Sequence, residues 1–143
     1  AVDAQILISK HGDRKHLTDA HLHRLTFTPA NAEAWNRLAV DLHLQGTLDE
    51  RMRQAVERAL TLAPHSRSIA ISQSIIAAYN WERASPALRE TWLTAFDTAA
   101  LAHNSLIYSA NQAGVGAQLC AAMPTSSRPN EYCRIRPAMA QLC

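Results

Sequence analysis

The chain has 143 residues, of which 48% are apolar and 18% charged, and its formal net charge is +2. A single domain of this length buries enough surface to fold without a metal or a disulfide. The small charge, spread along the chain, gives no electrostatic support for nucleic-acid binding. The longest apolar run falls far short of the roughly 20 residues that span a bilayer.

The composition predicts an all-α protein. Alanine is abundant and β-branched runs are scarce, and Ala, Leu, Arg, Gln and Glu lose little freedom in a helix. The sequence begins with Ala and not Met, which suggests a processed chain or an excised fragment. An upstream signal peptide or membrane anchor would then lie outside these residues.

The first thirty residues predict two helices. The first covers AQILISKHGD and ends near Gly12, and Asp13 is a good cap for the second, which runs through RKHLTDAHLHRLTFTP to Pro29. The same order of boundary residues, a glycine that ends one helix and a proline that ends the next, occurs again between Gly46 and Pro64.

Residues 31–64 predict a helical hairpin. Asn31 is a good N-cap, and Gly46 ends the first helix because Gly adopts the left-handed conformation without penalty. Thr47 with Glu50 three residues later forms a capping box that begins a second helix, which ends at Pro64. The connection is short, so the two helices must be antiparallel neighbours.

The spacing of these signals indicates an internal repeat. Gly12 and Pro29 are 17 residues apart, Gly46 and Pro64 are 18 apart, and the two prolines are separated by 35. The unit resembles a tetratricopeptide repeat. Seven residues of residues 31–64 match that pattern: Trp35, Leu38, Ala39, Leu42, Gly46, Ala59 and Pro64.

The sequence also departs from the tetratricopeptide pattern at several positions. One extra residue lies between the two helices' landmarks, Met52 stands where the family prefers Ala, and Arg24 stands where a small residue is usual. The resemblance implies a right-handed α-solenoid of about three antiparallel hairpins. The parts would be residues 1–29 as the first repeat, 30–64 as the second, 65–104 as a degenerate third, and 105–143 as capping helices and a Cys-bearing tail.

The third hairpin and the tail are less regular. Ser66 or Ser68 can cap a helix through HSRSIAISQSIIAAYNW, whose residues for burial are Ile69, Ile71, Ile75 and Ala78. Ser85 followed by Pro86 is a strong start for the next helix. A shorter pair follows in SLIYSANQAG and GAQLCAAMP, then a loop at TSSRPN and one or two helical turns in EYCRIRPAMAQLC.

The three cysteines lie in the last quarter of the chain, at Cys120, Cys133 and Cys143, with spacings that match no zinc or thioredoxin-type pattern. One bridge and one free thiol suit an oxidising compartment, and three buried thiols suit the cytosol. Both alternatives stay open from the sequence.

No catalytic or metal motif stands out. His16, His21 and His23 include no i, i+4 pair, so we interpret them as solvated or partly packed. There is no nucleophile elbow, P-loop or dinucleotide fingerprint. Trp81 and Tyr79 are candidates for an aromatic ligand box near a helix end. The simpler interpretation is that the tryptophans pack between the helical hairpins. We expect no cofactor and no enzymatic activity.

The family resemblance implies a groove lined by the first helix of each repeat. In the second unit the groove residues would be Asn36, Val40 and His43, with Arg37 close by, able to bind a peptide backbone or carboxylate. The Lys and Asn pattern of the carboxylate-clamp subtype is not reproduced. We therefore expect a scaffolding module that holds a protein or peptide.

Two rival hypotheses belong to other classes. The chain is either an accessory soluble domain of a membrane-bound glycosyltransferase or polymerase, or a self-associating module that forms homo-oligomers. The segment YNWERASPALRETW and the Cys-bearing tail are similar to tetratricopeptide-like domains of bacterial polysaccharide-assembly proteins. That similarity implies a periplasmic or extracytoplasmic location and a membrane anchor. The alternative is a cytoplasmic location.

Overall fold

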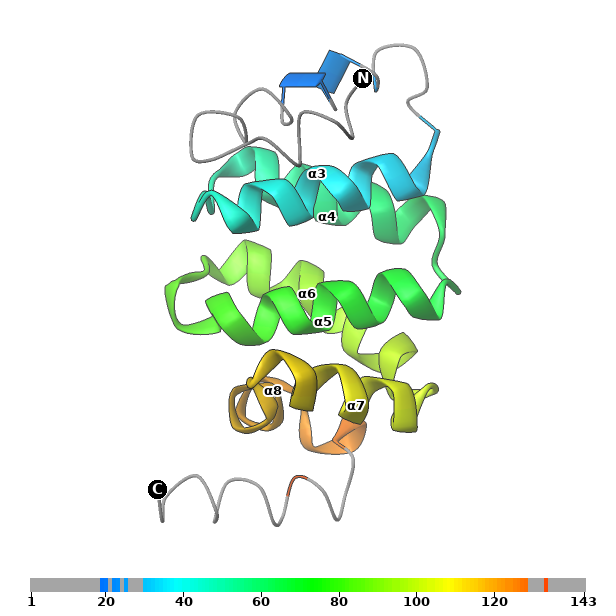
Figure 1. Ribbon diagram of the computed structural model, residues 1–143, viewed down its shortest axis with the longest axis vertical. Helices are drawn as coiled ribbons and strands as arrows, with labels where there is room; N and C mark the ends of the chain where they lie inside the picture. The colour runs from blue at the N-terminus through cyan, green and yellow to red at the C-terminus, as the bar shows by residue number, and fades with distance from the viewer. Residues whose placement is uncertain (1–18, 21, 24, 26–29, 129–132, 134–143) are drawn as a thin grey trace. The chain divides into compact units, whose positions relative to one another are not determined.

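The computed structural model of the chain describes residues 19–20, 22–23, 25, 30–128 and 133. Over these residues the regular elements are α-helices and 3-10 turns, without a strand, which confirms the all-α prediction there (Figure 1). The described residues between 19 and 25 are helical, within the helix predicted to reach Pro29. The helix predicted over residues 4–13, the cap at Asp13 and most of the tail lie outside the described residues.

The chain divides into two compact units, Ala1–Ala63 and Pro64–Cys143. In the first unit, α3 (Ala32–Leu44) and α4 (Glu50–Leu62) pack together as a helical hairpin. The predicted N-cap is confirmed, because the Ala34 backbone N–H donates to Asn31 Oδ1 at 3.1 Å. The core of the hairpin consists of Ala34, Leu38, Ala39 and Leu42 from α3 and Met52, Ala55, Val56 and Ala59 from α4.

The turn after α3 follows from Gly46, as predicted. Its φ of 74° is left-handed, its N–H donates to the His43 carbonyl at 2.9 Å, and the Thr47 N–H donates to the Leu42 carbonyl at 2.9 Å. These two bonds make a Schellman motif, which satisfies carbonyls that the last turn of the helix leaves open.

The predicted cap of α4 is wrong. Thr47 does not begin the helix. Asp49 does, because its Oδ1 accepts from the Arg51 N–H at 3.0 Å and the helix starts at Glu50. Asp49 is as good a cap as Thr and lies two residues later, next to the first helical residue, whereas the backbone N–H of Thr47 closes the end of α3. The predicted stop is confirmed, since α4 ends at Leu62 and Ala63 precedes Pro64.

Replacing Gly46 with alanine should lower the free energy of unfolding by about 1–2 kcal/mol, because the added Cβ destabilises the left-handed conformation. A Cβ there meets no atom within 4 Å, so the loss isolates backbone strain from steric clash. Urea unfolding followed by far-UV circular dichroism measures it. Gly46→Asn is the control and should lose less, since Asn tolerates this conformation. Equal losses for both variants would contradict the explanation.

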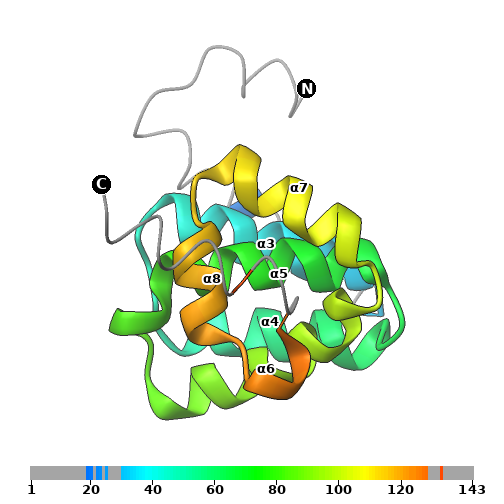
Figure 2. The ribbon, with the colours of Figure 1, turned by 90° about the horizontal axis from the view of Figure 1, so that it is seen from below.

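In the second unit α5 is the central helix, in contact with α6, α7 and α8 (Figure 2). Ser66, and not Ser68, caps α5, while Ser85 caps α6 with Pro86 at its first position, as predicted. The predicted loop at residues 125–130 contains a 3-10 turn. The elements are α5 (Arg67–Asn80), η1 (Trp81–Arg83), α6 (Pro86–Ala100), α7 (His103–Ala113), α8 (Gly116–Ala122) and η2 (Thr125–Ser127).

The buried face of α5 differs from the expected one. Ile69 and Ala78 are buried as predicted, but Ile71 and Ile75 are only half-buried. Because three helices pack around α5, its contacts extend over more than one face. The residues of α5 that become buried are Ile69, Ala70, Gln73, Ser74, Ile76, Ala77, Ala78 and Asn80.

Candidate functional site

The residues predicted to line a groove all lie on α3. Asn36, Val40 and His43 recur at spacings of four and three, so they share one face of the helix. Asn36 is buried with 7% of its surface exposed, and Val40 and His43 are half-buried. Asn36 and His43 also take part in interactions within the chain. The structure thus brings these residues together on one face, where Asn36 is the least accessible.

A neighbouring line of residues on α3, which we call the α3 strip, contains the exposed Arg37 and Leu44 and the half-buried Val40. Their spacings of three and four place them on one side of the helix over two turns. Arg37 is exposed and Leu44 is 50% exposed. The strip therefore combines a guanidinium with apolar side chains on a helix that is capped at both ends.

The outer face of α4 carries paired charges. Arg53 Nε donates to Glu50 Oε1 at 2.8 Å, and another guanidinium nitrogen of Arg53 pairs with Glu57. The hydrogen bond from Arg53 lowers the pKa of Glu50, and the bonds to Glu50 and Glu57 raise the pKa of Arg53. A carboxyl group whose pKa is lowered in the folded state stabilises the fold at pH values above its ordinary pKa. This stabilisation is lost as the pH falls through the lowered pKa. These groups are solvent-exposed, so their ion pairs contribute little to stability.

A polar cluster holds the connection between α5 and α6. Arg89 Nε donates to the Trp81 carbonyl at 2.8 Å and its terminal nitrogen donates to the Glu82 carbonyl at 3.3 Å. The same guanidinium lies 5.4 Å from the Trp81 ring centroid, a cation–π distance. Arg83 donates to the side-chain oxygen of Asn80, whose amide donates to the Ile76 carbonyl. These bonds hold the connection between α5 and α6 in place.

Replacing Arg89 with lysine should lower the free energy of unfolding by about 1–2 kcal/mol. Lysine keeps the charge near Trp81, but it lacks the fork that reaches two carbonyls at once. Thermal unfolding with circular dichroism measures the change, and the exposed Arg58→Lys variant on α4 is the matched control. If the two variants have the same stability, the two carbonyl bonds do not order this connection.

The aromatic side chains of this region are engaged within the chain. The rings of Trp81 and Phe96 have centroids 5.6 Å apart, and Arg89 stacks on Trp81. The Tyr79 hydroxyl donates to the Ala113 carbonyl at 2.5 Å and so joins α5 to the last turn of α7. The candidate aromatic box of Trp81 and Tyr79 thus consists of side chains with structural partners of their own.

A buried hydrogen bond joins α5 to α6, and sequence reasoning missed it. Trp92 Nε1 donates to Gln73 Oε1 at 3.2 Å, and both residues have no exposed surface. A signal was present, since Ile69, Gln73, Ile76 and Asn80 recur at helical spacing and share one face. Polar residues in that series indicate that the buried face of α5 contains hydrogen-bonding groups.

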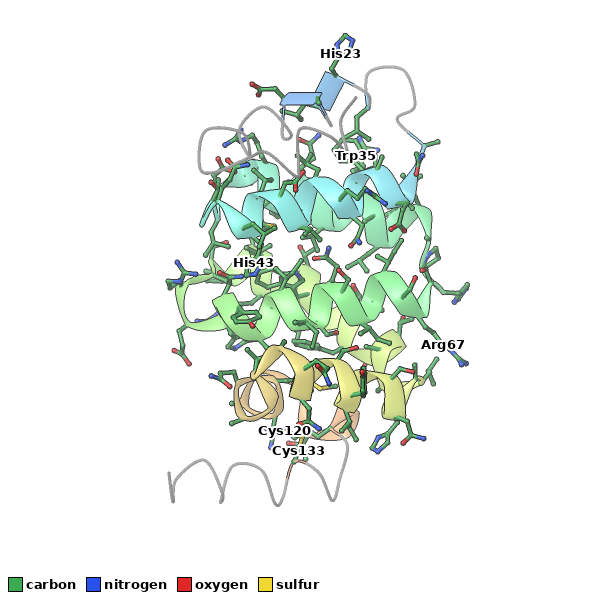
Figure 3. The ribbon with its side chains drawn as sticks, viewed as in Figure 1. His23, Trp35, His43, Arg67, Cys120 and Cys133 are labelled. Atoms are coloured by element: carbon green, nitrogen blue, oxygen red, sulfur yellow. A yellow bond between two sulfur atoms is a disulfide. The ribbon has the colours of Figure 1, made fainter. Side chains whose placement is uncertain are left out.

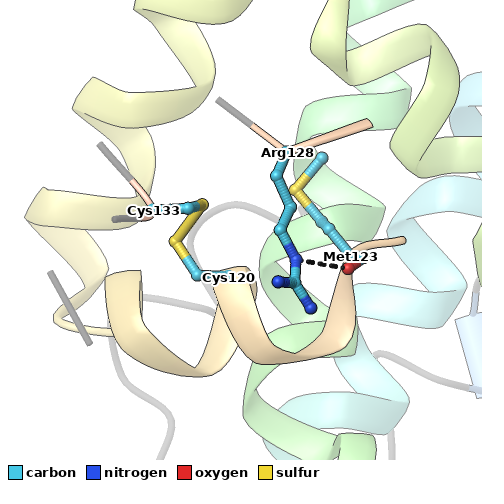
Figure 4. Close-up of a disulfide and its surroundings, with 4 residues drawn as sticks. All are labelled: Cys120, Met123, Arg128 and Cys133. Atoms are coloured by element: carbon cyan, nitrogen blue, oxygen red, sulfur yellow. Dashed lines mark hydrogen bonds between the residues drawn. A yellow bond between two sulfur atoms is a disulfide. The ribbon is translucent and has the colours of Figure 1, made fainter. Parts of the chain in front are cut away.

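Cys120 of α8 lies at disulfide distance from Cys133, with Cα atoms 5.3 Å apart (Figure 3). Of the two alternatives left open by the sequence, the structure has the bridge. The residue Cys143 lies outside the described residues. Close by, Arg128 Nε donates to the Met123 carbonyl at 2.9 Å (Figure 4).

Within the part of the chain that the structure describes, no three His, Cys, Asp or Glu side chains are placed to hold a metal ion. His23 is exposed (Figure 3), while His16 and His21 lie outside the described residues. Among the described helices, none is both long and apolar enough to cross a bilayer.

Comparison with known proteins finds no match among protein-family models, curated proteins or solved structures. The tetratricopeptide resemblance stays a prediction from the sequence. The candidate site considered below is the α3 strip, which includes Arg37 and Val40 from the predicted groove and the exposed Leu44.

Proposed function

We propose that the chain is a non-catalytic helical module that binds a protein or peptide partner through α3. The observation that carries this proposal is the α3 strip, which offers an exposed guanidinium beside apolar side chains. The resemblance adds that the hairpins stack as a tetratricopeptide-like solenoid, with α3 on the concave side and Asn36 and His43 at the edge of the groove.

The chemistry of the strip suits an extended or helical peptide. The Arg37 guanidinium presents donors in a planar fork, which fits a carboxylate or a backbone carbonyl of the partner. Val40 and Leu44 on the same side offer apolar surface for one side chain of the peptide. The helix α3 is capped at both ends, so its backbone holds these residues at fixed spacings and less backbone entropy is lost on binding.

Selection of a phage-displayed peptide library on the protein tests the proposal, with affinities of the selected peptides measured by isothermal titration. We expect Arg37→Glu and Leu44→Asp each to weaken binding by at least tenfold. Arg58→Glu on the outer face of α4 is the matched control and should leave binding unchanged. Peptides that bind all variants equally, or hydrolase or transferase turnover without any selected peptide, would overturn the proposal.

The disulfide supports a location outside the cytoplasm for this module. Disulfides persist in oxidising environments and are rare in the cytosol, so we propose that the protein works outside the cytoplasm. Mass spectrometry of the unreduced protein, isolated without reductant, should show Cys120 linked to Cys133. Free thiols at both positions would count against this placement.

A further inference from the structure

The helix α7 lies in a long stretch of sequence without carboxylate or strongly basic side chains. Residues 98–127 contain no Asp, Glu, Lys or Arg, and His103 is the one residue there that can become a cation near neutral pH. Other helices do present charges to solvent, such as Glu90 and Asp97 on α6 and Arg58 on α4. The surface of α7 is therefore close to neutral.

One side of α7 packs within the second unit, and the opposite side is exposed. The helix contacts α5, α6 and α8 (Figure 2), and Leu106 and Ala110 are buried. On the opposite side Asn104, Tyr108 and Gln112 are exposed, and 66% of the Tyr108 surface is accessible. Their spacing of four residues places them along one ridge of the helix. We call these three residues the α7 ridge.

The α7 ridge has the same order of chemical groups in both directions. Tyr108 is in the middle, and a side-chain amide lies four residues away on each side, which is about 6 Å along the helix axis. In an antiparallel pair of α7 helices centred on Tyr108, Asn104 of each copy therefore lies opposite Gln112 of the other. Each amide has an oxygen that accepts and an NH2 group that donates, so the two amides can bond to each other. The ridge is thus complementary to itself.

We propose that two copies of the chain associate through α7, with their α7 ridges antiparallel across a twofold axis at Tyr108. The centres of protein interfaces are rich in tyrosine and poor in Lys, Glu and Asp. A twofold interface places a patch against its own copy, so a neutral patch avoids like-charge repulsion. A helix of 11 residues offers a small contact, and we expect reversible association in the micromolar range or weaker. This interface uses no residue of the α3 strip.

Sedimentation equilibrium of the full chain, from micromolar to millimolar concentration, tests this association. The measurements use Cys143→Ser, so that a covalent dimer through that thiol does not contribute. We expect a monomer–dimer equilibrium, which Tyr108→Glu weakens by at least tenfold because it places two carboxylates at the axis. Gln54→Glu on the exposed face of α4 is the matched control and should keep the dimer. A strict monomer, or a dimer that Tyr108→Glu leaves unchanged, would overturn the proposal.

A mixture of two variants tests the twofold axis separately. Tyr108→Glu and Tyr108→Lys should each stay monomeric where the parent chain dimerises. Their equimolar mixture should form a mixed dimer, because the introduced carboxylate of one copy then faces the introduced ammonium group of the other. This recovery also shows that both variants are folded. A mixture that stays monomeric would overturn the arrangement, since residue 108 of the two copies would then not be adjacent.

A third variant tests the antiparallel direction. Asn104→Asp combined with Gln112→Lys in one chain places opposite charges across the axis twice when the helices are antiparallel. We expect this double variant to dimerise several-fold more tightly at low salt and to lose the gain at high salt. A parallel pair would instead bring like charges together. Weaker association of the double variant would therefore overturn the proposal.

Discussion

Replacing Trp92 with alanine will lower the free energy of unfolding of the second unit by about 3–5 kcal/mol. Trp92 has no exposed surface, and it fills the space between α5 and α6 next to the buried Phe96. Alanine leaves a cavity there and removes the donor to Gln73. Hydrogen exchange of the α5 and α6 amides in urea measures the loss within this unit. A loss below about 1 kcal/mol, as surface substitutions give, would contradict the packing.

A double-mutant cycle separates the hydrogen bond from the packing. Trp92→Phe keeps an aromatic ring but removes the indole N–H, so Gln73 Oε1 loses this bond inside the core. Gln73→Leu alone leaves the indole N–H without that acceptor. We expect the double variant to be more stable than the sum of the two single losses predicts, by about 1 kcal/mol. Additive losses would show that the bond contributes nothing beyond packing.

The parts of the fold that depend on neighbouring residues were predictable from the sequence. Asn31, Gly46, Ser85 and Pro86 act within one helical turn, and each is where the pattern placed it. The prediction of a cap at Thr47 was wrong because the sequence offers two good cap residues there, and Asp49 begins α4. The backbone N–H of Thr47 bonds to the end of α3.

The parts that depend on distant residues were not predictable in the same way. The buried face of α5 is set by three helices that pack on it. The spacing of Gln73 and Ile76 with their neighbours shows that they share a face, but only the packing shows that this face is inside. The bridge of Cys120 with Cys133 depends on how the chain returns after η2, which cysteine spacing does not specify. The candidate site stands between these cases, because helical spacing grouped Asn36, Val40 and His43, but only the structure shows that Arg37 and Leu44 are more accessible.

In the first unit, replacing Leu38 with alanine will lower the free energy of unfolding by about 2–5 kcal/mol. Leu38 is 1% exposed and packs between α3 and α4 with Leu42 and Val56, both without exposed surface. Removing three carbon atoms from this position loses their burial and leaves a cavity that the short hairpin can close only in part. Urea unfolding by far-UV circular dichroism gives the loss directly.

Leu44 on the same helix supplies the control that links stability to the proposed function. It is 50% exposed, so Leu44→Ala should change the free energy of unfolding by no more than about 0.5 kcal/mol. The α3 strip nevertheless includes it, so the same substitution should weaken peptide binding. A variant that lowers affinity while the fold keeps its stability separates a binding residue from a core residue. If Leu44→Ala destabilises the protein as much as Leu38→Ala, its side chain belongs to the core and the strip is not an interaction surface.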